Sequence, residues 1–192
     1  MFTGIIEETG LVQKIEEEGS NRHFYVTAPM AAALRPDESV AHNGVCLTVV
    51  ENDSSTYKVT AVEETLRKSN LSDLQVGDRI NLERSMVANG RFDGHIVQGH
   101  VDTVAVCKSI EERQGSWLFT FHLPEPTRLL VEKGSVAVNG ISLTCFEVQD
   151  DAFTVAIIPY TYEHTNLGTL RAGDRVNIEF DIIGKYVARL LG

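Results

Sequence analysis

Asn43-Gly44-Val45-Cys46-Leu47-Thr48 is repeated further along the chain as Asn139-Gly140-Ile141-Ser142-Leu143-Thr144. The offset from position 43 to position 139 is 96 residues, and two more pairs of segments keep it: Asn70–Leu71 with Asn166–Leu167, and Gly77–Glu83 with Gly173–Glu179. One offset shared by three separate segments indicates two copies of a single structural unit. The period is far longer than the roughly 20–50 residues of a solenoid repeat, so each copy is long enough to be a small domain.

Short β-prone segments bounded by turn residues dominate both copies. We expect strands at residues 45–50, 56–62 and 79–83 of the first copy, and at 141–148, 153–158 and 175–181 of the second. The two Asn-Gly dipeptides favour tight turns, because both residues tolerate a positive φ angle. Many short strands at even spacing, twice over, predict an all-β fold of two small antiparallel barrels or sandwiches.

Helices are expected only in short pieces, at residues 30–34 and 64–69, and at the end of the sequence. From position 182, apolar residues recur at spacings of three and four, as in an amphipathic helix: Ile182, Ile183, Tyr186, Val187, Leu190 and Leu191. A helix this short is marginal alone, so its apolar stripe should pack on its own barrel or on other chains. We predict domains at residues 1–90 and 91–181, a linker at 85–91, and an oligomerisation helix at 182–192.

The composition argues against several classes of protein. The 192 residues are 43% hydrophobic and 23% charged, an ordinary globular balance, but the formal net charge is −10. This charge disfavours non-specific nucleic-acid binding and anchoring on anionic lipid. No apolar run approaches the ~20 residues that span a bilayer, and Met1–Gly4 does not begin a secretory signal. The three cysteines have no CxxC spacing, so we expect reduced thiols in the cytoplasm rather than a zinc site.

Each strand that follows an Asn-Gly turn carries a pair of small polar side chains on one face. Because side chains alternate along a strand, Cys46 and Thr48 oppose three apolar residues, as Ser142 and Thr144 do in the second copy. Such a pair suits a planar heteroaromatic ligand, although a simply solvated polar face explains the pattern as well. The strand ends at 60–65 and 156–161 are also equivalent, and their free backbone groups could bind the amide edge of a ligand. Alternatively, their threonines cap short helices.

Gly94–His100 contains two Gly-His pairs, and the two histidines are five positions apart. This spacing separates the two rings on either a strand or a helix, so it favours acid/base work over metal binding, with purely structural histidines as the alternative. At the 96-residue offset His100 aligns with Gly4, which makes the starts of the two copies chemically unequal. Cys46 against Ser142 is a second inequality, and a thiolate nucleophile at Cys46 is one reading of it.

Taken together, several segments resemble riboflavin synthase, a trimeric family built from two lumazine-binding barrels: Met1–Ile5, Ser39–Thr48, Glu64–Leu66, Gly94–Val101, Asn139–Thr144 and Asn177–Asp181. The resemblance covers nearly the whole chain. It implies two closed Greek-key β-barrels with a short C-terminal α-helix. The implied reaction transfers a four-carbon unit between two molecules of 6,7-dimethyl-8-ribityllumazine, giving riboflavin and 5-amino-6-ribitylaminouracil without a metal or redox cofactor. A donor and an acceptor need two similar but unequal sites.

The resemblance also implies site residues. For the first site they are Gly4, Ile5, Ile6, Ser39, Cys46, Leu47, Thr48, Thr60, Ala61, Val62, Glu63, Glu64 and Thr65. For the second site they are Gly99, His100, Val101, Lys133, Ser142, Leu143, Thr144, Ala156, Ile157, Ile158, Pro159, Tyr160, Thr161 and Asp181. His100 and Thr144 are the implied proton-transfer pair at the acidic C7 methyl, and Cys46 or a water would add to C7 of the acceptor. Ser142 and Asp181 complete the catalytic candidates.

The resemblance further implies a homotrimer whose active site lies between the first barrel of one subunit and the second barrel of the next, and it suggests lumazine synthase as a partner. The sequence departs from the family at Val62–Glu63, at Asn139 and in its short final helix. The competing interpretations are a non-catalytic lumazine or flavin carrier of the same fold and a purely structural two-barrel protein.

Overall fold

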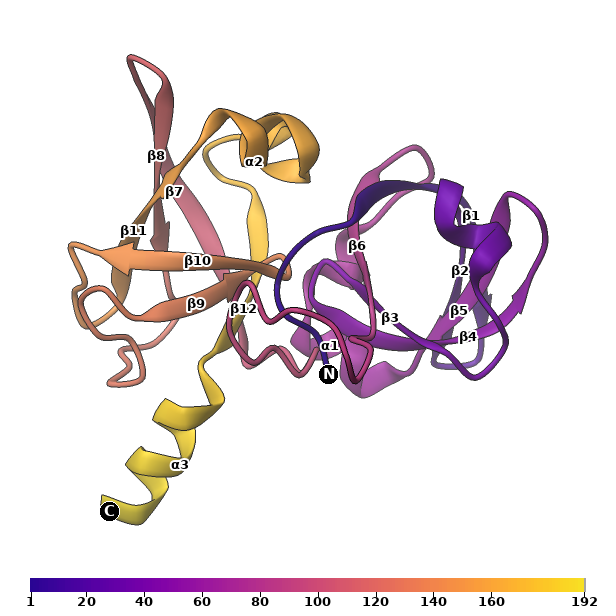
Figure 1. Ribbon diagram of the computed structural model, residues 1–192, viewed down its shortest axis with the longest axis horizontal. Coiled ribbons are helices and arrows are strands. Elements are labelled where there is room, and N and C mark those ends of the chain that lie inside the picture. The colour runs from indigo at the N-terminus through magenta and orange to yellow at the C-terminus, as the bar shows by residue number, and fades with distance from the viewer. Residues whose placement is uncertain (192) are drawn as a thin grey trace.

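The computed structural model describes residues 1–191 and contains two closed antiparallel barrels side by side, with one helix projecting from the second (Figure 1). The strands of the first barrel are β1 (Glu8–Glu18), β2 (Asn21–Thr27), β3 (Ser39–His42), β4 (Val45–Asn52), β5 (Thr56–Ala61) and β6 (Arg79–Arg84). They close in the order β1-β2-β5-β4-β3-β6, each antiparallel to its neighbours.

The second barrel repeats this topology. Its strands are β7 (Thr103–Arg113), β8 (Ser116–His122), β9 (Ser135–Val138), β10 (Ile141–Phe146), β11 (Ala152–Ile157) and β12 (Arg175–Phe180). Their closed order, β10-β11-β8-β7-β12-β9, matches the first barrel strand for strand. The prediction of an all-β fold with two closed barrels is therefore confirmed, and the sandwich alternative is wrong. All six predicted strands are present, with ends that differ by one or two residues.

Short helices join the strands. Pro29–Ala33, Asn70–Asp73 and Asn166–Thr169 form 3-10 turns (η1, η2 and η3), and α1 (Glu63–Lys68) and α2 (Pro159–His164) follow β5 and β11. The expected helical piece at 30–34 is thus a 3-10 turn, and the one at 64–69 is α1. Residues 85–91 lie in the loop that leads from the first barrel to the second.

Alternation along the strands builds each core. In β4, Val45, Leu47 and Val49 are buried inside the barrel, whereas Cys46 is partly exposed and Thr48 is exposed. β10 follows the same pattern around Ser142 and Thr144. Aromatic side chains fill much of the second core, where the rings of Phe119, Phe121 and Phe153 pack together. The small polar pairs therefore lie on the outer faces of the two barrels.

The offset between the copies is not constant. β3 and β9 begin 96 residues apart, at 39 and 135, but β1 and β7 begin 95 apart, at 8 and 103. The extra residue lies in the connection between the second and third strands of the second barrel. Near the start of the two copies the offset is 95, and Phe2 pairs with its equivalent, Val97, through two backbone hydrogen bonds of 2.7 and 3.1 Å. Gly4 is therefore equivalent to Gly99, and the alignment of His100 with Gly4 is wrong: His100 matches Ile5.

The two barrels meet at their Asn-Gly turns, across an approximate twofold axis. A Cβ atom on either Gly44 or Gly140 would lie 2.7 Å from the backbone nitrogen of the other. Around this contact the amide of Asn81 donates to the Asn139 carbonyl at 3.0 Å, and the amide of Asn177 donates to the Asn43 carbonyl at 2.8 Å. These two reciprocal hydrogen bonds pair buried amide groups, which would destabilise the fold if they were left unpaired.

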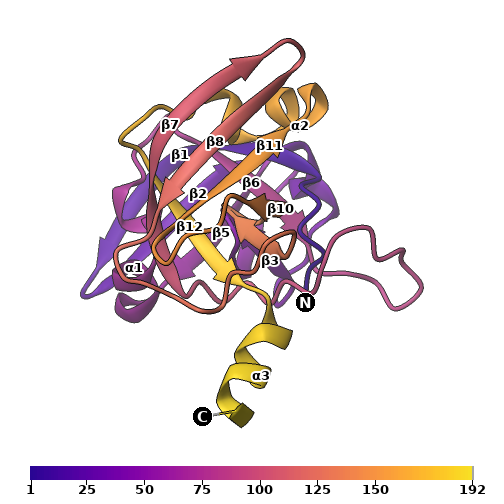
Figure 2. The same ribbon diagram turned by 90° about the vertical axis from the view of Figure 1, so that its left-hand side faces the viewer.

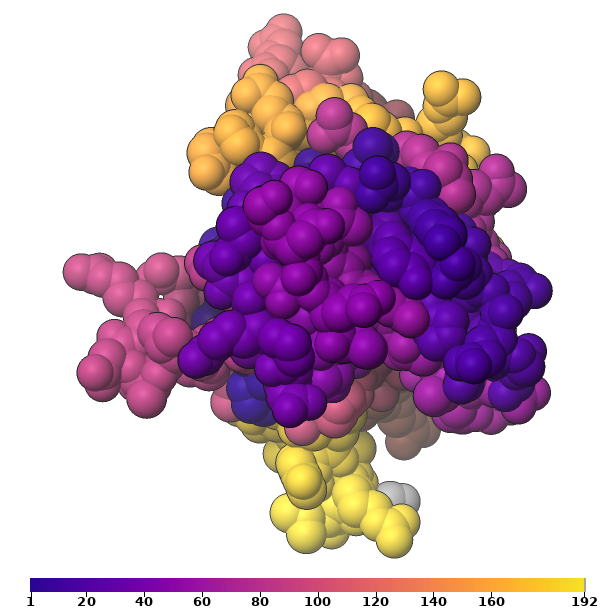
Figure 3. Space-filling model, turned by 90° about the vertical axis from the view of Figure 1, so that its right-hand side faces the viewer, coloured from indigo at the N-terminus to yellow at the C-terminus, as the bar shows by residue number. Residues whose placement is uncertain are grey.

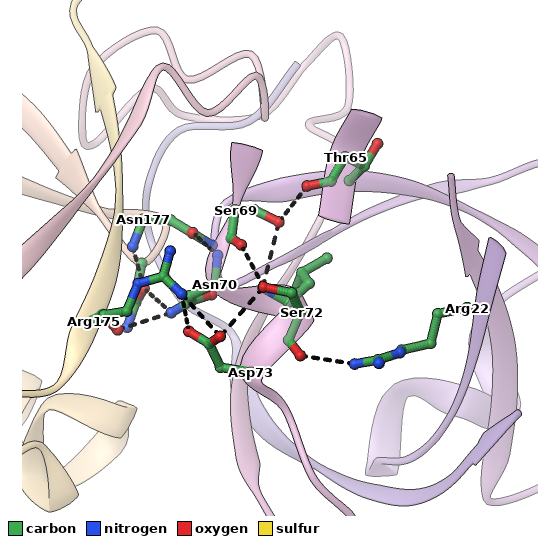
Figure 4. Close-up of polar contacts among 10 residues, drawn as sticks. Arg22, Thr65, Ser69, Asn70, Ser72, Asp73, Arg175 and Asn177 are labelled. Atoms are coloured by element: carbon green, nitrogen blue, oxygen red, sulfur yellow. Dashed lines mark hydrogen bonds and ion pairs between the residues drawn. The ribbon is translucent and has the colours of Figure 1, made fainter. Parts of the chain in front are cut away.

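Asparagines at the start of η2 and η3 extend the seam. The Asn70 backbone N–H donates to Asn177 Oδ1 at 2.6 Å (Figure 4), and the Asn166 N–H donates to Asn81 Oδ1 at 2.7 Å. At the exposed edge of this contact an ion pair between Arg175 and Asp73 also joins the barrels, with 2.6 Å between nitrogen and oxygen (Figure 4). The repeated asparagines thus fix how the barrels sit relative to each other.

Helix α3 (Ile182–Leu191) projects beyond both barrels (Figures 2 and 3). Its apolar stripe remains exposed, with Leu190 82% and Leu191 84% accessible. One ion pair anchors the helix, since Lys185 Nζ lies 2.6 Å from the Asp102 carboxylate. The stripe is therefore left uncovered by its own barrel in the single chain, and contact with other chains stays a prediction.

Candidate functional site

Two buried carboxylates, Glu83 and Glu179, each bind the backbone of a loop that lies against the outer face of a barrel. Glu83 accepts hydrogen bonds from the Thr3 N–H at 2.7 Å, the Thr3 hydroxyl at 2.8 Å and the Gly4 N–H at 3.0 Å. Glu179 accepts from the N–H groups of residues 98, 99 and 100 at 2.6, 2.9 and 2.9 Å. Burial raises the pKa of both carboxyls, although the N–H donors oppose it. These anchors fix both loops.

Each of these loops crosses to the other barrel. The Ser142 N–H donates to the Gly4 carbonyl at 2.8 Å, and the Cys46 N–H donates to the Gly99 carbonyl at 2.9 Å. Both glycines have a positive φ, near +80°, and a Cβ on either would lie 2.6 or 2.5 Å from the Cβ of Ser142 or Cys46. Only glycine permits so close an approach.

This crossing corrects the predicted division of residues between the sites. The structure places Gly4, Ile5 and Ile6 in a segment that crosses to the second barrel, and Ile6 packs against that barrel's core. It places Gly99, His100 and Val101 beside the first barrel, where Val101 packs. The sequence could not show this exchange, because each loop reaches its anchor about 80 residues away along the chain.

The first site is a cavity of about 510 Å³ beside β4 and α1. Its lining joins residues from distant parts of the chain: Val45, Cys46, Glu64, Thr65, Lys68, Ser69, Gly99, His100, Val101 and Asp102. A thiol, an imidazole, an ammonium and carboxylates therefore surround one space. Ser39 lies apart from it, in a groove of about 540 Å³ that it shares with Ile5.

The second site is the open outer face of β10. Ser142 Oγ shares a hydrogen bond of 2.7 Å with Nδ1 of His95, a residue that is only 7% exposed. Burial lowers the pKa of His95, and the negative charge of Asp181 partly opposes this. Thr144 is exposed on the same face, opposite Ser135 of β9. At its edge Lys133 has a φ of 66° and places its Nζ 5.0 Å from the centre of the Phe146 ring.

The strand ends at 60–65 and 156–161 have equivalent structures. Val62, Glu63 and Glu64 are exposed after β5, as Ile158, Pro159 and Tyr160 are after β11. Thr65 and Thr161 do not cap helices, because α1 begins after Val62 and α2 after Ile158. The capping side chains are instead Ser69 and Thr165, which accept from Leu71 and Leu167. The interpretation of Thr65 and Thr161 as caps is therefore wrong.

Several of the predicted ligand-binding residues have side chains that point away from the outer faces or are already hydrogen-bonded. Leu47, Ala61 and Ile157 are buried in the two cores, so only their backbone groups can reach a ligand. Thr60 hydrogen-bonds His23 Nδ1 at 2.8 Å on the outer face of the first barrel. Leu143 packs against the second core, and Ala156 is exposed beside it. Conversely, the prediction omitted His95, although its Gly-His signal matches that of His100.

The structure also separates the predicted proton-transfer pair. His100 lies in the cavity with Cys46, on the first barrel, whereas Thr144 lies on the outer face of the second. His42 lies near Cys46 in the sequence but cannot act as a base for its thiol, because the ring is buried and shares a 2.8 Å hydrogen bond with Tyr57. A site that uses His100 and Thr144 together thus needs faces from two barrels.

Within residues 1–191 no three His, Cys, Asp or Glu side chains gather as a metal site. Over the same residues, no helix has the length and apolar character to cross a membrane.

Comparison with known proteins gives consistent matches. The family model of the lumazine binding domain matches twice, over residues 3–85 and 98–181. Riboflavin synthase of Bacillus amyloliquefaciens is 42% identical over 193 residues, covering 100% of this chain and 90% of that protein. The riboflavin synthase of Mycobacterium tuberculosis (strain ATCC 25618 / H37Rv) is 43% identical over 202 residues, covering 100% and 98%. That of Schizosaccharomyces pombe is 38% identical, covering 100% and 94%.

The fold also matches a solved structure. LumP complexed with riboflavin superposes with a TM-score of 0.86 over 94% of this chain and 99% of that chain. At 23% identity this likeness concerns the fold alone.

Proposed function

Because the chain belongs to the riboflavin synthase family, we propose that it converts two molecules of 6,7-dimethyl-8-ribityllumazine into riboflavin and 5-amino-6-ribitylaminouracil. One molecule gives up a four-carbon unit and the other accepts it. The observation that carries this proposal is the duplicated outer face with unequal side chains. Cys46 with His100 lines the first site, and Ser142 with His95 and Thr144 forms the second. Two copies of one substrate with different roles require such a pair.

We place the reaction between two chains. His100 and Thr144 lie on different barrels of one chain, so they can act on the same pair of substrates when the first barrel of one subunit faces the second barrel of its neighbour. The second site is open in a single chain, and a facing barrel would exclude water from it. The exposed stripe of α3 supplies an apolar contact for this assembly, and we propose a homotrimer.

The roles within that site follow from the chemistry of each group. His100 and Thr144 transfer the proton of the acidic C7 methyl group, because an imidazole can both accept and release a proton. Cys46, or a water beside it, adds to C7 of the acceptor. Ser142, Lys133 and Asp181 bind polar groups of the second substrate. Free cysteines at all three positions suit the cytoplasm, where we place the protein. Lumazine synthase stays a predicted partner.

The test is incubation of the purified chain with 6,7-dimethyl-8-ribityllumazine while riboflavin absorbance is followed. Growth of the riboflavin band supports the proposal. Tight binding of the lumazine without turnover would identify a carrier instead, and the absence of binding would identify a structural protein.

Variants of the candidate side chains sharpen this test. We expect His100→Gln and Thr144→Val each to lower turnover by roughly 10²–10⁴-fold, the usual contribution of a positioned acid or base. Cys46→Ser should retain part of the activity, because a hydroxyl occupies the matching position, Ser142, in the second barrel. His122→Gln is the control, since His122 is exposed and its Nε2 lies 3.0 Å from the Asp151 carboxylate, outside both candidate sites. Near-normal turnover in folded His100→Gln and Thr144→Val would contradict the assigned roles.

A further inference from the structure

The ring of His95 is in close contact with Ser142, although the proposed reaction gives His95 no part in proton transfer. The backbone approach at Gly94 makes the contact possible, because a Cβ at that position would collide with the Thr3 carbonyl and lie 3.1 Å from Ser142 Oγ. The His95 N–H donates to the same Thr3 carbonyl at 3.1 Å, which fixes the start of the side chain. The ring then reaches Ser142 Oγ at 2.7 Å. Backbone and side chain together therefore aim Nδ1 at one hydroxyl.

The hydrogen bonds of His95 are unusual for a histidine that only supports the fold. The residue is 93% buried, since 7% of it is exposed, yet its Nε2 has no hydrogen-bond partner within residues 1–191. Buried polar atoms are normally paired, and the unpaired ones concentrate where function requires them. His42, the buried histidine of the first barrel, has partners for both ring nitrogens. The difference indicates that His95 is there for its Nδ1 bond.

The bond also distinguishes the two sites. A neutral imidazole has one donor and one acceptor nitrogen, so Nδ1 either donates a hydrogen bond to Ser142 Oγ or accepts one from the Ser142 hydroxyl. In the first case the hydroxyl is free to donate to a ligand, and in the second it offers the ligand only lone pairs. Either way its orientation is fixed. Cys46, at the matching position of the first barrel, is a free thiol whose neighbour His42 is bound to Tyr57.

We propose that His95 is a positioning residue for the second ligand site, and that its Nδ1 orients the Ser142 hydroxyl toward a polar edge of the bound lumazine or riboflavin. The inference rests on the proposed function for the identity of that ligand. It gives a physical origin to the inequality of the two barrels: one outer face carries an oriented hydroxyl, and the other carries an unrestrained thiol.

The experiment is a double-mutant cycle on the full chain, with riboflavin as the binding probe. The variants are His95→Asn, His95→Gln, Ser142→Ala and each histidine variant combined with Ser142→Ala. The amide of asparagine can occupy the place of Nδ1, whereas that of glutamine extends to the place of Nε2. We expect His95→Gln and Ser142→Ala each to weaken riboflavin binding about tenfold, the equivalent of one hydrogen bond, and His95→Asn to weaken it less than threefold.

The decisive comparison is in the Ser142→Ala background, where His95→Gln should cause no further loss, because coupled residues are non-additive. Additive losses, or equal losses for Asn and Gln, would mean that His95 only fills space and would overturn the proposal. If the Gln variant fails to fold, Ser142→Ala decides alone, and unchanged riboflavin affinity in it overturns the proposal. Lack of turnover by the unaltered chain would instead refute the proposed function, and the binding cycle is independent of that result.

Discussion

His42 and Tyr57 form a polar pair inside the first barrel, at positions where the second barrel has Val138 and Phe153. Burial lowers the pKa of His42 to about 4, from an ordinary value of 6.5, and its bonds to the backbone only partly oppose this. Protonation therefore favours the unfolded chain. Above pH 6.5 His42 is neutral in both states and does not lower the free energy of unfolding. As the pH falls from 6.5 toward 4, this residue lowers the free energy of unfolding by a total of roughly 3 kcal/mol.

The double variant His42→Val, Tyr57→Phe gives the first barrel the side chains of the second. We expect its free energy of unfolding to vary less with pH than that of the unaltered chain between pH 6.5 and 4. Glu83 and Glu179, whose raised pKa values act in the opposite direction, are the same in both proteins. Denaturant unfolding at fixed protein concentration measures this. Tyr57→Phe alone should keep the pH dependence while losing about 1–3 kcal/mol at every pH, because it leaves Nε2 unpaired. Parallel curves for the double variant and the unaltered chain would contradict the assignment.

Helix α3 exposes an apolar stripe that the proposed trimer would cover. We expect Val187→Asp to weaken self-association by about tenfold or more, because a carboxylate would be buried in the contact. Ala188→Asp is the matched control: it adds the same single negative charge at an exposed position off the stripe and should leave association nearly unchanged. Sedimentation velocity over a concentration series distinguishes the two variants. Equal effects would show that charge, not burial, controls assembly, and a monomer at micromolar concentration for the unaltered chain would remove the premise.

The sequence predicts the elements well where the two copies still resemble each other. The Asn-Gly turns and the strands after them are predictable because repetition and alternation coincide there. The one-residue shift of β1 against β7 is not, since the extra residue lies in a connection where the copies no longer match. Glu83 and Glu179 lie in the repeated segments, but the N–H groups that donate hydrogen bonds to them belong to loops distant in sequence. The exchange of loops, and with it the pairing of His100 with Cys46, follows from tertiary contacts that no local pattern encodes.

At the scale of the whole molecule, the barrels of one chain are locked together. Their Asn-Gly turns are in contact, and buried asparagine amides cross between them. The outer faces of β4 and β10 therefore keep a fixed relation within the chain, and the proposed reaction brings two substrates together between faces of two chains. Complementation between damaged chains tests this directly. Thr48 and Thr144 are exposed at equivalent positions of the two barrels, so Thr48→Trp and Thr144→Trp block one face each without disturbing a core.

Each tryptophan variant alone should be nearly inactive. Unfolded together in equal amounts and refolded, the two should regain activity, because roughly a quarter of the interfaces in randomly mixed trimers join two unblocked faces. Variants that are refolded separately and then mixed provide the control, and native mass spectrometry confirms that mixed assemblies have formed. Activity that never exceeds that of the separate variants, despite mixed trimers, would place both substrates on one chain. The locked arrangement of the two barrels would then have to open during turnover, and an asparagine variant such as Asn177→Ala would raise the rate rather than only destabilise the fold.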